Sequence, residues 1–211
     1  MRDQSANGKQ GYNILLVGVG GQGIILASDL LSNLGLELGM DVKKSEIHGM
    51  AQRGGSVESH VRLGKDVLSP LIPAGQADFV LCVEQVEALR HLDHLAEDGT
   101  MLVSSVRVIP PSVTVGGERY PSGDEIEAEL KRHTARVAML ELPELMREVG
   151  NPRTANIIML GAMSAFLPFE PEIWKSTLAG FLPEKIVKVN LAAFDVGRRE
   201  GLAARERMPS G

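Results

Sequence analysis

The sequence has very little cysteine, because Cys82 is the only one in 211 residues. An iron–sulfur cluster takes about four thiolate ligands, and a structural zinc ion takes several Cys or His side chains. The chain alone therefore cannot hold an iron–sulfur cluster, and we expect neither a structural zinc site nor a disulfide framework. Because Cys82 lies in an apolar stretch, we expect a core residue rather than a nucleophile.

Positive charge and long hydrophobic runs are also scarce. The net charge is −5 and no stretch rich in Lys and Arg offsets it, so we expect no nucleic-acid partner and no anionic membrane surface. The longest nearly apolar run, residues 155–169, is too short to cross a bilayer. Residues 1–12 are polar and lack the apolar core of a signal peptide. We therefore expect a soluble, cytoplasmic protein.

Strand-like and helix-like segments alternate over roughly the first 145 residues, which predicts an α/β fold. The predicted strands are residues 13–18, 41–47, 56–63, 78–83, 100–106 and 136–142, and the predicted helices are residues 24–38, 84–96, 122–133, 153–166, 171–181 and 184–205. Ser122, with Glu125 three residues later, is a capping signal for the helix at residues 122–133. We expect a three-layer, Rossmann-like domain with a mixed, mainly parallel sheet of about five or six strands and a helical C-terminal extension. This single domain spans residues 12–205, with flexible tails at residues 1–11 and 206–211.

The first motif, Gly18-Val-Gly20-Gly21-Gln22-Gly23, lies between a predicted strand and a predicted helix, as a G-x-G-x-x-G turn requires. In such a turn Gly18 permits the tight bend, Gly20 permits close approach to the backbone, and Gly23 permits the helix to pack near the strand. Exposed N–H groups at the start of the helix favour an anion.

A dinucleotide site also needs an acidic residue near the end of the second strand. Asp41 comes before the apolar part of that strand and Glu46 comes late, so the match is incomplete. The turn therefore has three interpretations: a nicotinamide or flavin site, a backbone-packing turn, or a turn that faces a partner or a phosphate-bearing ligand.

The second motif runs from Ser45 to Val57 and alternates functional side chains with very small residues. Its glycines permit positive φ angles and close approach of another molecule, and its polar groups supply an acceptor, a titratable ring, an amide and a cation. The glycines are Gly49, Gly54 and Gly55, and the polar residues are Glu46, His48, Gln52 and Arg53. The motif indicates a binding loop, or alternatively a glycine-rich hairpin with solvated charges.

His91 and His94 stand three residues apart, a spacing that suits a metal ion. No third ligand is evident in the sequence, and the surrounding pattern is that of an amphipathic helix. We therefore expect a solvated helix face and no metal site in this chain. In the strand predicted at residues 56–63, Glu58, His60 and Arg62 alternate with mostly apolar residues. Because successive side chains of a strand point to opposite faces, we expect these three to form its solvent-facing side.

Taken together, the two motifs resemble those of the small (beta) subunits of indolepyruvate:ferredoxin oxidoreductases, which are similar to the gamma domains of 2-oxoacid:ferredoxin oxidoreductases. The resemblance runs from about residue 12 to about residue 200. Within it, the tetrapeptide Met50-Ala-Gln-Arg53 resembles the arylpyruvate branch of the family and not the pyruvate branch. Further matches are Ser69–Pro73, Glu84 with Ala88-Leu89, Ile109–Pro111, Gly150–Arg153 with Asn156, and Leu160–Ala162.

The resemblance implies a subunit of an enzyme that oxidatively decarboxylates a 2-oxoacid, here indolepyruvate or another arylpyruvate. Coenzyme A takes the acyl group and ferredoxin takes the electrons. Thiamine diphosphate, magnesium and iron–sulfur clusters carry the chemistry. This chain lacks a G-D-G motif followed by Asn-Asn, and Gly123-Asp124-Glu125 is no substitute. We therefore expect these cofactors in a larger, alpha-type partner subunit and none in this chain.

The resemblance also suggests that the glycine turn and the loop at residues 48–55 face that partner, near the active site or the coenzyme A entrance. There Arg53 and free N–H groups can meet a phosphate or carboxylate. His48 is the candidate catalytic residue, as a proton shuttle or a hydrogen-bonding group. Two rival hypotheses are an independent NAD(P)-binding reductase and a non-enzymatic ligand-sensing or assembly module.

Overall fold

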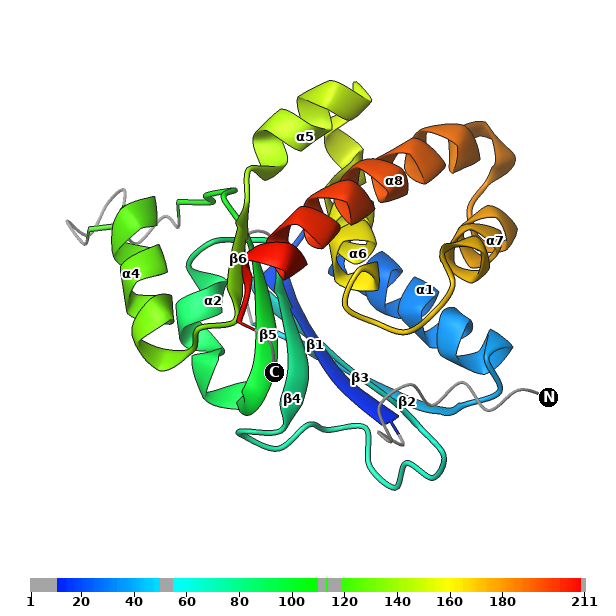
Figure 1. The fold of residues 1–211 in the computed structure, drawn as a ribbon, viewed down its shortest axis with the longest axis horizontal. Helices are drawn as coiled ribbons and strands as arrows, with labels where there is room; N and C mark the ends of the chain where they lie inside the picture. The colour runs from blue at the N-terminus through cyan, green and yellow to red at the C-terminus, as the bar shows by residue number, and fades with distance from the viewer. Residues whose placement is uncertain (1–10, 50–54, 110–112, 114–118, 210–211) are drawn as a thin grey trace.

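The computed structural model describes residues 11–49, 55–109, 113 and 119–209. Within them a six-stranded sheet forms the centre of the molecule, in the order β2-β3-β1-β4-β5-β6 (Figure 1). The strands are β1 (Gly11–Val19), β2 (Asp41–His48), β3 (Ser56–Gly64), β4 (Ala77–Cys82), β5 (Leu95–Ser104) and β6 (Val137–Leu140). The strands β1, β4, β5 and β6 pair in parallel, whereas β3 pairs antiparallel with β1 and β2. The predicted mixed, mainly parallel sheet is confirmed.

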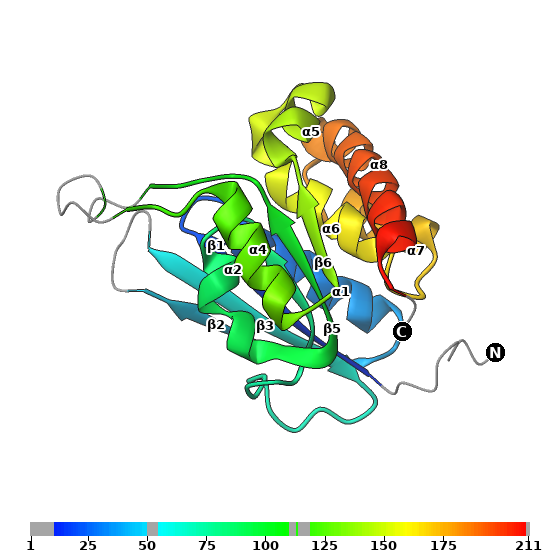
Figure 2. The same ribbon diagram turned by 60° about the vertical axis from the view of Figure 1, so that its left-hand side comes forward.

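Helices lie on both faces of the sheet and make a three-layer structure, which Figure 2 shows from a second direction. The helices are α1 (Ile24–Glu37), α2 (Glu87–Arg90), α4 (Gly123–His133), α5 (Leu142–Val149), α6 (Ala155–Ser164), α7 (Pro171–Phe181) and α8 (Glu184–Arg207), with 3₁₀ turns η1 (Leu92–His94) and η2 (Pro152–Thr154). Helices α2 and α4 lie on one face, and the others lie on the opposite face (Figure 1).

Strand β1 shows why both faces must be covered. Ile14 and Leu16 belong to the core that includes α1 and α6, whereas Leu15 and Val17 belong to the core that includes α4. All four side chains are fully buried. Because successive side chains of a strand point to opposite faces, a continuous apolar run predicts a strand covered on both sides.

The C-terminal helices pack on the sheet through α6, which is buried along its length from Asn156 to Ser164. Its backbone touches that of α8 at glycines. A Cβ at Gly197 would lie 1.9 Å from the Ile158 carbonyl oxygen, and one at Gly201 would lie 2.2 Å from that of Ala162. Only glycine permits this approach of two helices. In the described residues, no helix combines the length and apolarity needed to cross a bilayer.

Several predicted boundaries need correction. The helix predicted at residues 84–96 is only the short α2 followed by η1, because Leu95 already pairs with Ala77 as the start of β5. Non-local strand pairing overrides helical periodicity there. Helix α5 was not predicted, although Pro143 in its first turn and Gly150 at its C-terminal end, with φ +77°, are ordinary helix signals.

The predicted solvent-facing side of β3 is wrong at one position. His60 is 2% exposed and lies beneath the segment that joins β3 to β4. Glu58 and Arg62, its neighbours on the same face, remain partly exposed. The predicted capping box of α4 is confirmed, since Ser122 and Glu125 exchange hydrogen bonds.

We expect Gly197→Ala to lower the free energy of unfolding by about 2–3 kcal/mol, because the added methyl group forces α8 away from α6. Gly180→Ala is the matched control: Gly180 is also helical, but a Cβ there meets nothing within 4 Å. That control should raise stability by up to about 1 kcal/mol. Urea unfolding of both variants measures the effects, and equal stabilities would show that the helix contact is not close.

Candidate functional site

The two sequence motifs meet at one edge of the sheet. The parallel strands β1, β4, β5 and β6 all end at this edge, and β2 ends and β3 begins there because they run antiparallel. The Gly20 N–H donates to the Gly55 carbonyl at 3.0 Å, and the Gly49 N–H donates to the Ser56 carbonyl at 2.9 Å. The glycine turn and the β2–β3 loop are therefore hydrogen-bonded neighbours, close enough to contact the same bound molecule.

The side chain of Gln22 fills the inside of the glycine turn. Its Oε1 accepts the Val19 N–H at 2.9 Å, and its Nε2 donates to the Val83 carbonyl at 3.4 Å. A Cβ at Gly18 would lie 2.6 Å from Gln22 Oε1, so glycine at position 18 makes room for this amide. Since the N–H groups of Val19, Gly20 and Gln22 are all engaged within the protein, the turn offers fewer donors to a pyrophosphate than its sequence suggests.

Gly23 is required by a contact with a distant part of the chain. It adopts φ +75° and caps α1, and a Cβ there would lie 2.6 Å from Asn156 Nδ2. That same Nδ2 donates to the Gly23 carbonyl at 3.0 Å. The start of α6 therefore rests directly on the glycine turn.

A cavity of about 380 Å³ opens between these two helix starts. Its apolar wall is formed by Leu26, Val83, Val106 and Met146. Arg153 also lines it and is exposed, and within the described part of the chain no carboxylate lies at ion-pair distance from its guanidinium. The positive ends of α1 and α6 and this cation favour an anionic group with an apolar body.

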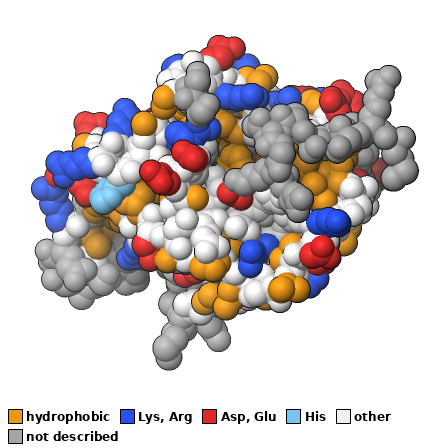
Figure 3. Space-filling model, turned by 60° about the horizontal axis from the view of Figure 1, so that its bottom comes forward, with side chains coloured by type: hydrophobic (Ala, Val, Ile, Leu, Met, Phe, Trp, Pro, Cys, Tyr) orange, Lys and Arg blue, Asp and Glu red, His pale blue; other side chains and the backbone are white. Residues whose placement is uncertain are grey.

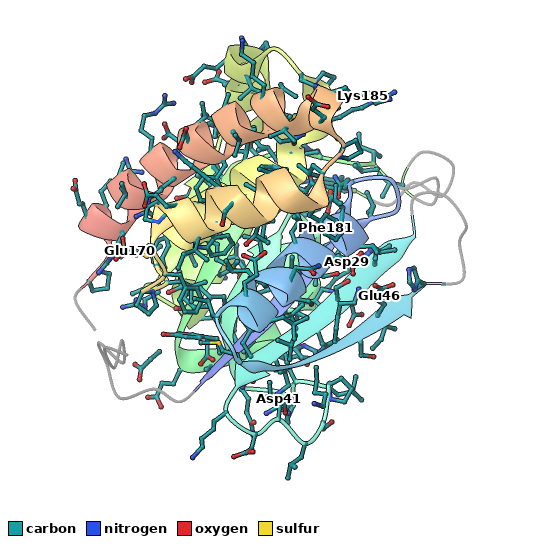
Figure 4. All side chains as sticks on the ribbon, turned by 90° about the vertical axis from the view of Figure 1, so that its right-hand side faces the viewer. Asp29, Asp41, Glu46, Glu170, Phe181 and Lys185 are labelled. Atoms are coloured by element: carbon teal, nitrogen blue, oxygen red, sulfur yellow. The ribbon has the colours of Figure 1, made fainter. Side chains whose placement is uncertain are left out.

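On the hairpin side, an ionic network ties β2 to α1. Lys44 binds the carboxylates of Asp29 and Glu46, the latter at 2.7 Å, and Figure 4 shows these two acids on neighbouring elements. Burial alone would lower the pKa of Lys44, but these two carboxylates raise it. His48 Nε2 lies 3.9 Å from Glu46 Oε2 and half of the side chain is exposed, so a protonated His48 can form an ion pair or reach a partner.

Part of the second motif, including Gln52, Arg53 and Gly54, lies outside the described residues. Those three residues stay candidates from the sequence alone. Of the other predicted site residues, Gly18 and Gln22 are engaged inside the protein, whereas Gly21, Gly49 and His48 lie at the surface of the edge.

Glu84 is a residue of this edge to which the sequence assigned no role. It is fully buried and lies two residues beyond the end of β4. One carboxylate oxygen accepts the N–H groups of Val86 and Glu87 at 2.8 and 3.1 Å, and the other accepts the Val108 N–H at 3.0 Å and the Tyr120 hydroxyl. Burial, and then Glu84, raises the pKa of Tyr120. Glu84 thus ties together the segments that follow β4 and β5, and a charged residue ending an apolar strand was the available signal.

The structure also tests the predictions made for Cys82 and His91. Cys82 is fully buried in β4, and burial raises the pKa of its thiol well above the usual value, so the predicted unreactive core residue is confirmed. The solvated face predicted for His91 is wrong, because that side chain is 7% exposed and lies beside Glu87. Among the described residues, no group of three or more His, Cys, Asp and Glu side chains is arranged to hold a metal ion.

Comparison with known proteins identifies the family. The family model for pyruvate ferredoxin/flavodoxin oxidoreductase matches residues 13–200. The chain belongs to this family. Within it, subunit IorB of the indolepyruvate oxidoreductase of Archaeoglobus fulgidus is 38% identical over 195 residues, which cover 92% of this chain and 96% of that subunit. The resemblance predicted from the two motifs is confirmed.

Solved structures in the family have the same fold. The gamma subunit of a keto/oxoacid ferredoxin oxidoreductase from Geobacter sulfurreducens matches with a TM-score of 0.67 and 27% identity, over 91% of this chain and 99% of that one. The 2-oxoglutarate:ferredoxin oxidoreductase of Magnetococcus marinus matches in fold with a TM-score of 0.68 and 20% identity, over 92% of this chain but 32% of that chain. The predicted α/β fold with C-terminal helices is confirmed.

We expect Glu84→Gln to destabilise the protein by about 3 kcal/mol, because the new amide nitrogen must face at least one buried backbone N–H. Glu97→Gln, at an exposed position, should change stability by less than about 0.5 kcal/mol. Thermal unfolding compares the two, and a similar result for both would mean that the Glu84 carboxylate does not hold this edge together.

Proposed function

We propose that this chain is the small subunit of an indolepyruvate:ferredoxin oxidoreductase. The enzyme converts indolepyruvate or another arylpyruvate, with coenzyme A, into an aryl-acetyl-CoA and carbon dioxide, and passes the electrons to ferredoxin. The observation that carries this proposal is the match along nearly the full length of both chains to a subunit named for indolepyruvate oxidation. Family membership makes the chain a subunit of an oxidoreductase rather than a free-standing NAD(P) reductase.

The residues of this chain do not suit the cofactors of the reaction. The only thiol, Cys82, is fully buried, and burial disfavours its thiolate. An iron–sulfur cluster needs several accessible thiolates, which this chain cannot supply. We place thiamine diphosphate, magnesium and the iron–sulfur clusters in a larger alpha subunit. We also propose that the whole complex lies in the cytoplasm.

We further propose that the edge with the glycine turn and the β2–β3 loop faces that partner. The surface groups there include Gly21, His48 and Arg153, and the sequence adds Arg53. The cavity beside Arg153 pairs an apolar wall with a cation, which suits a phosphate or carboxylate carried on an apolar chain, as in coenzyme A or the 2-oxoacid. The role of this subunit is to bind and orient that group and to exclude water from it.

In this arrangement the buried contacts act indirectly. Gln22 and Asn156 hold the glycine turn, and Glu84 holds the segments beside it, so the surface groups keep a defined geometry. His48, next to Glu46, is placed to hold a proton or to donate a hydrogen bond at the subunit boundary.

The proposal is tested by expressing the chain alone and together with its larger partner subunit. Alone, the chain should be colourless, should reduce no viologen dye with arylpyruvate and coenzyme A, and should not bind NADH or NADPH. The complex should be brown and should reduce the dye. Turnover of a 2-oxoacid by the isolated chain, or tight NADPH binding, would refute the proposal.

In the assembled enzyme, we expect Arg153→Ala to lower kcat/KM for coenzyme A or the 2-oxoacid about tenfold or more, because a charge-assisted hydrogen bond contributes about 1.5–3 kcal/mol. Arg53→Ala should act in the same direction. The control is Arg132→Ala on α4, an exposed arginine paired with Glu129. Steady-state kinetics with each substrate varied in turn separates an effect on coenzyme A from an effect on the 2-oxoacid. Full activity of an assembled Arg153→Ala enzyme would show that Arg153 contacts neither of them.

A further inference from the structure

A cluster of acidic and histidine side chains lies between β3 and the α2–η1 segment, and the proposed function does not use it. Its members are Glu58, His60, Glu87, His91 and His94. His60 Nε2 lies 3.6 Å from Glu58, and His91 Nε2 lies 3.4 Å from Glu87 and 3.9 Å from Glu58. The His94 ring centroid is 5.9 Å from those of the other two rings.

His60 also holds the segment at residues 69–75, which joins β3 to β4. The Ile72 N–H donates to His60 Nδ1 at 3.2 Å. Ile72 is 3% exposed and belongs to the same core as Leu15 and Val17 of β1. The histidine ring therefore attaches the middle of this segment to the sheet.

This bond determines where the ring carries its proton. A ring nitrogen that accepts a hydrogen bond has no proton of its own, so neutral His60 carries its single proton on Nε2, facing Glu58. A second proton has to go to Nδ1, where it would oppose the Ile72 N–H. A charged His60 and the bond to Ile72 are therefore mutually exclusive.

We propose that His60 is a proton-operated latch, which holds the segment at residues 69–75 on the sheet when the ring is neutral and releases it around Ile72 when Nδ1 is protonated. The ends of the segment keep other anchors. At one end Arg62 donates to the Ser69 carbonyl at 3.0 Å, and at the other end the Gly75 N–H donates to the Asp93 carbonyl at 2.8 Å. Arg62 also donates to the Leu71 carbonyl at 3.2 Å, but this carbonyl shares a peptide group with the Ile72 N–H and is released with it. The release is therefore local rather than an unfolding of the domain.

The groups around His60 decide the pH at which the latch opens. Burial lowers the pKa of His60, Glu58 opposes this, and His94 and His91 lower the pKa further. The cross-strand neighbour on β2 is the uncharged Ser45.

The remaining charges facing this cluster are largely balanced. Glu87, in the α2–η1 segment, accepts from Arg90 at 2.6 Å, and Asp93 lies 3.1 Å from His94. Arg62 extends along the same face of β3, and the segment at residues 69–75 has no ionisable side chain.

The sign of the pH effect follows from these surroundings. In the unfolded chain a histidine takes up a proton near about pH 6.5, whereas buried His60 does so at a lower pH. The folded protein therefore loses stability as the pH falls below the histidine pKa of the unfolded chain. Opening of the latch limits this loss, because it lets the ring take up its proton without unfolding the domain. Opening adds Ile72 to an apolar surface that already includes Leu68, 98% exposed, and Leu71, 49% exposed. Figure 3 turns this side of the molecule toward the viewer and shows hydrophobic side chains at the surface.

Amide hydrogen exchange on the full chain, followed by NMR between about pH 8 and about pH 5, tests the proposal. After correction for the intrinsic exchange rate, the protection of the Ile72 amide should fall about tenfold per pH unit below about pH 6.5, where the released histidine ring takes up a proton. The amides of Leu15 and Val80, in the centre of the sheet, should keep their protection.

Two variants separate the latch from its neighbours. In His60→Asn the side-chain oxygen takes the position of Nδ1 and accepts the Ile72 N–H without titrating, so protection at Ile72 should become independent of pH. In the control His91→Gln, His60 is intact, so the loss of protection in acid should remain. Protection at Ile72 that persists in the wild-type protein at the acid end, or that falls equally in His60→Asn, would overturn the proposal.

The nitrogen chemical shifts of the His60 ring in the wild-type protein give a readout that needs no variant. The proposal requires a proton on Nε2 and none on Nδ1 at neutral pH. A ring that carries its proton on Nδ1, or both protons, at neutral pH would refute the latch.

Discussion

The backbone contact between α6 and α8 is the constraint on which the geometry of the proposed site depends. At Gly161, Gly197 and Gly201 the two helices approach until any side chain would collide with a carbonyl group of the other helix. Helix α6 is also buried against the sheet, and Asn156 in its first turn donates a hydrogen bond to the Gly23 carbonyl. A wider helix pair would move Asn156 away and leave the turn without its support.

From Gly23 the support continues to the other parts of the edge. The glycine turn binds the β2–β3 loop through Gly20 and Gly55, and Gln22 joins the turn to the end of β4. Glu84 then connects the end of β4 to the segment after β5. Each link is a hydrogen bond between segments far apart in the chain. Such an edge presents a preformed surface, as suits a subunit that completes a site whose cofactors we assign to its partner.

Some features of this protein are local, and the sequence alone was enough to predict them. The apolar run in β1 predicted a strand buried on both faces, and Ser122 with Glu125 predicted the start of α4. The two glycine-containing motifs predicted the family, because their residue order is specific. The single cysteine excluded an iron–sulfur cluster held by this chain alone, since one thiolate cannot replace about four. The predictions of the strand, the helix and the family succeed because each depends on residues that are adjacent in the chain.

Other features depend on contacts between distant residues, and only the tertiary structure decided them. Pairing of Leu95 with Ala77 shortened the helix predicted at residues 84–96, and the segment containing Ile72 buried His60, which strand alternation had placed in solvent. Gly18 suits a phosphate-binding turn by sequence, yet in the fold it makes room for the side chain of Gln22. Periodicity reports which face of an element is apolar, but it carries no information about what another segment places on that face.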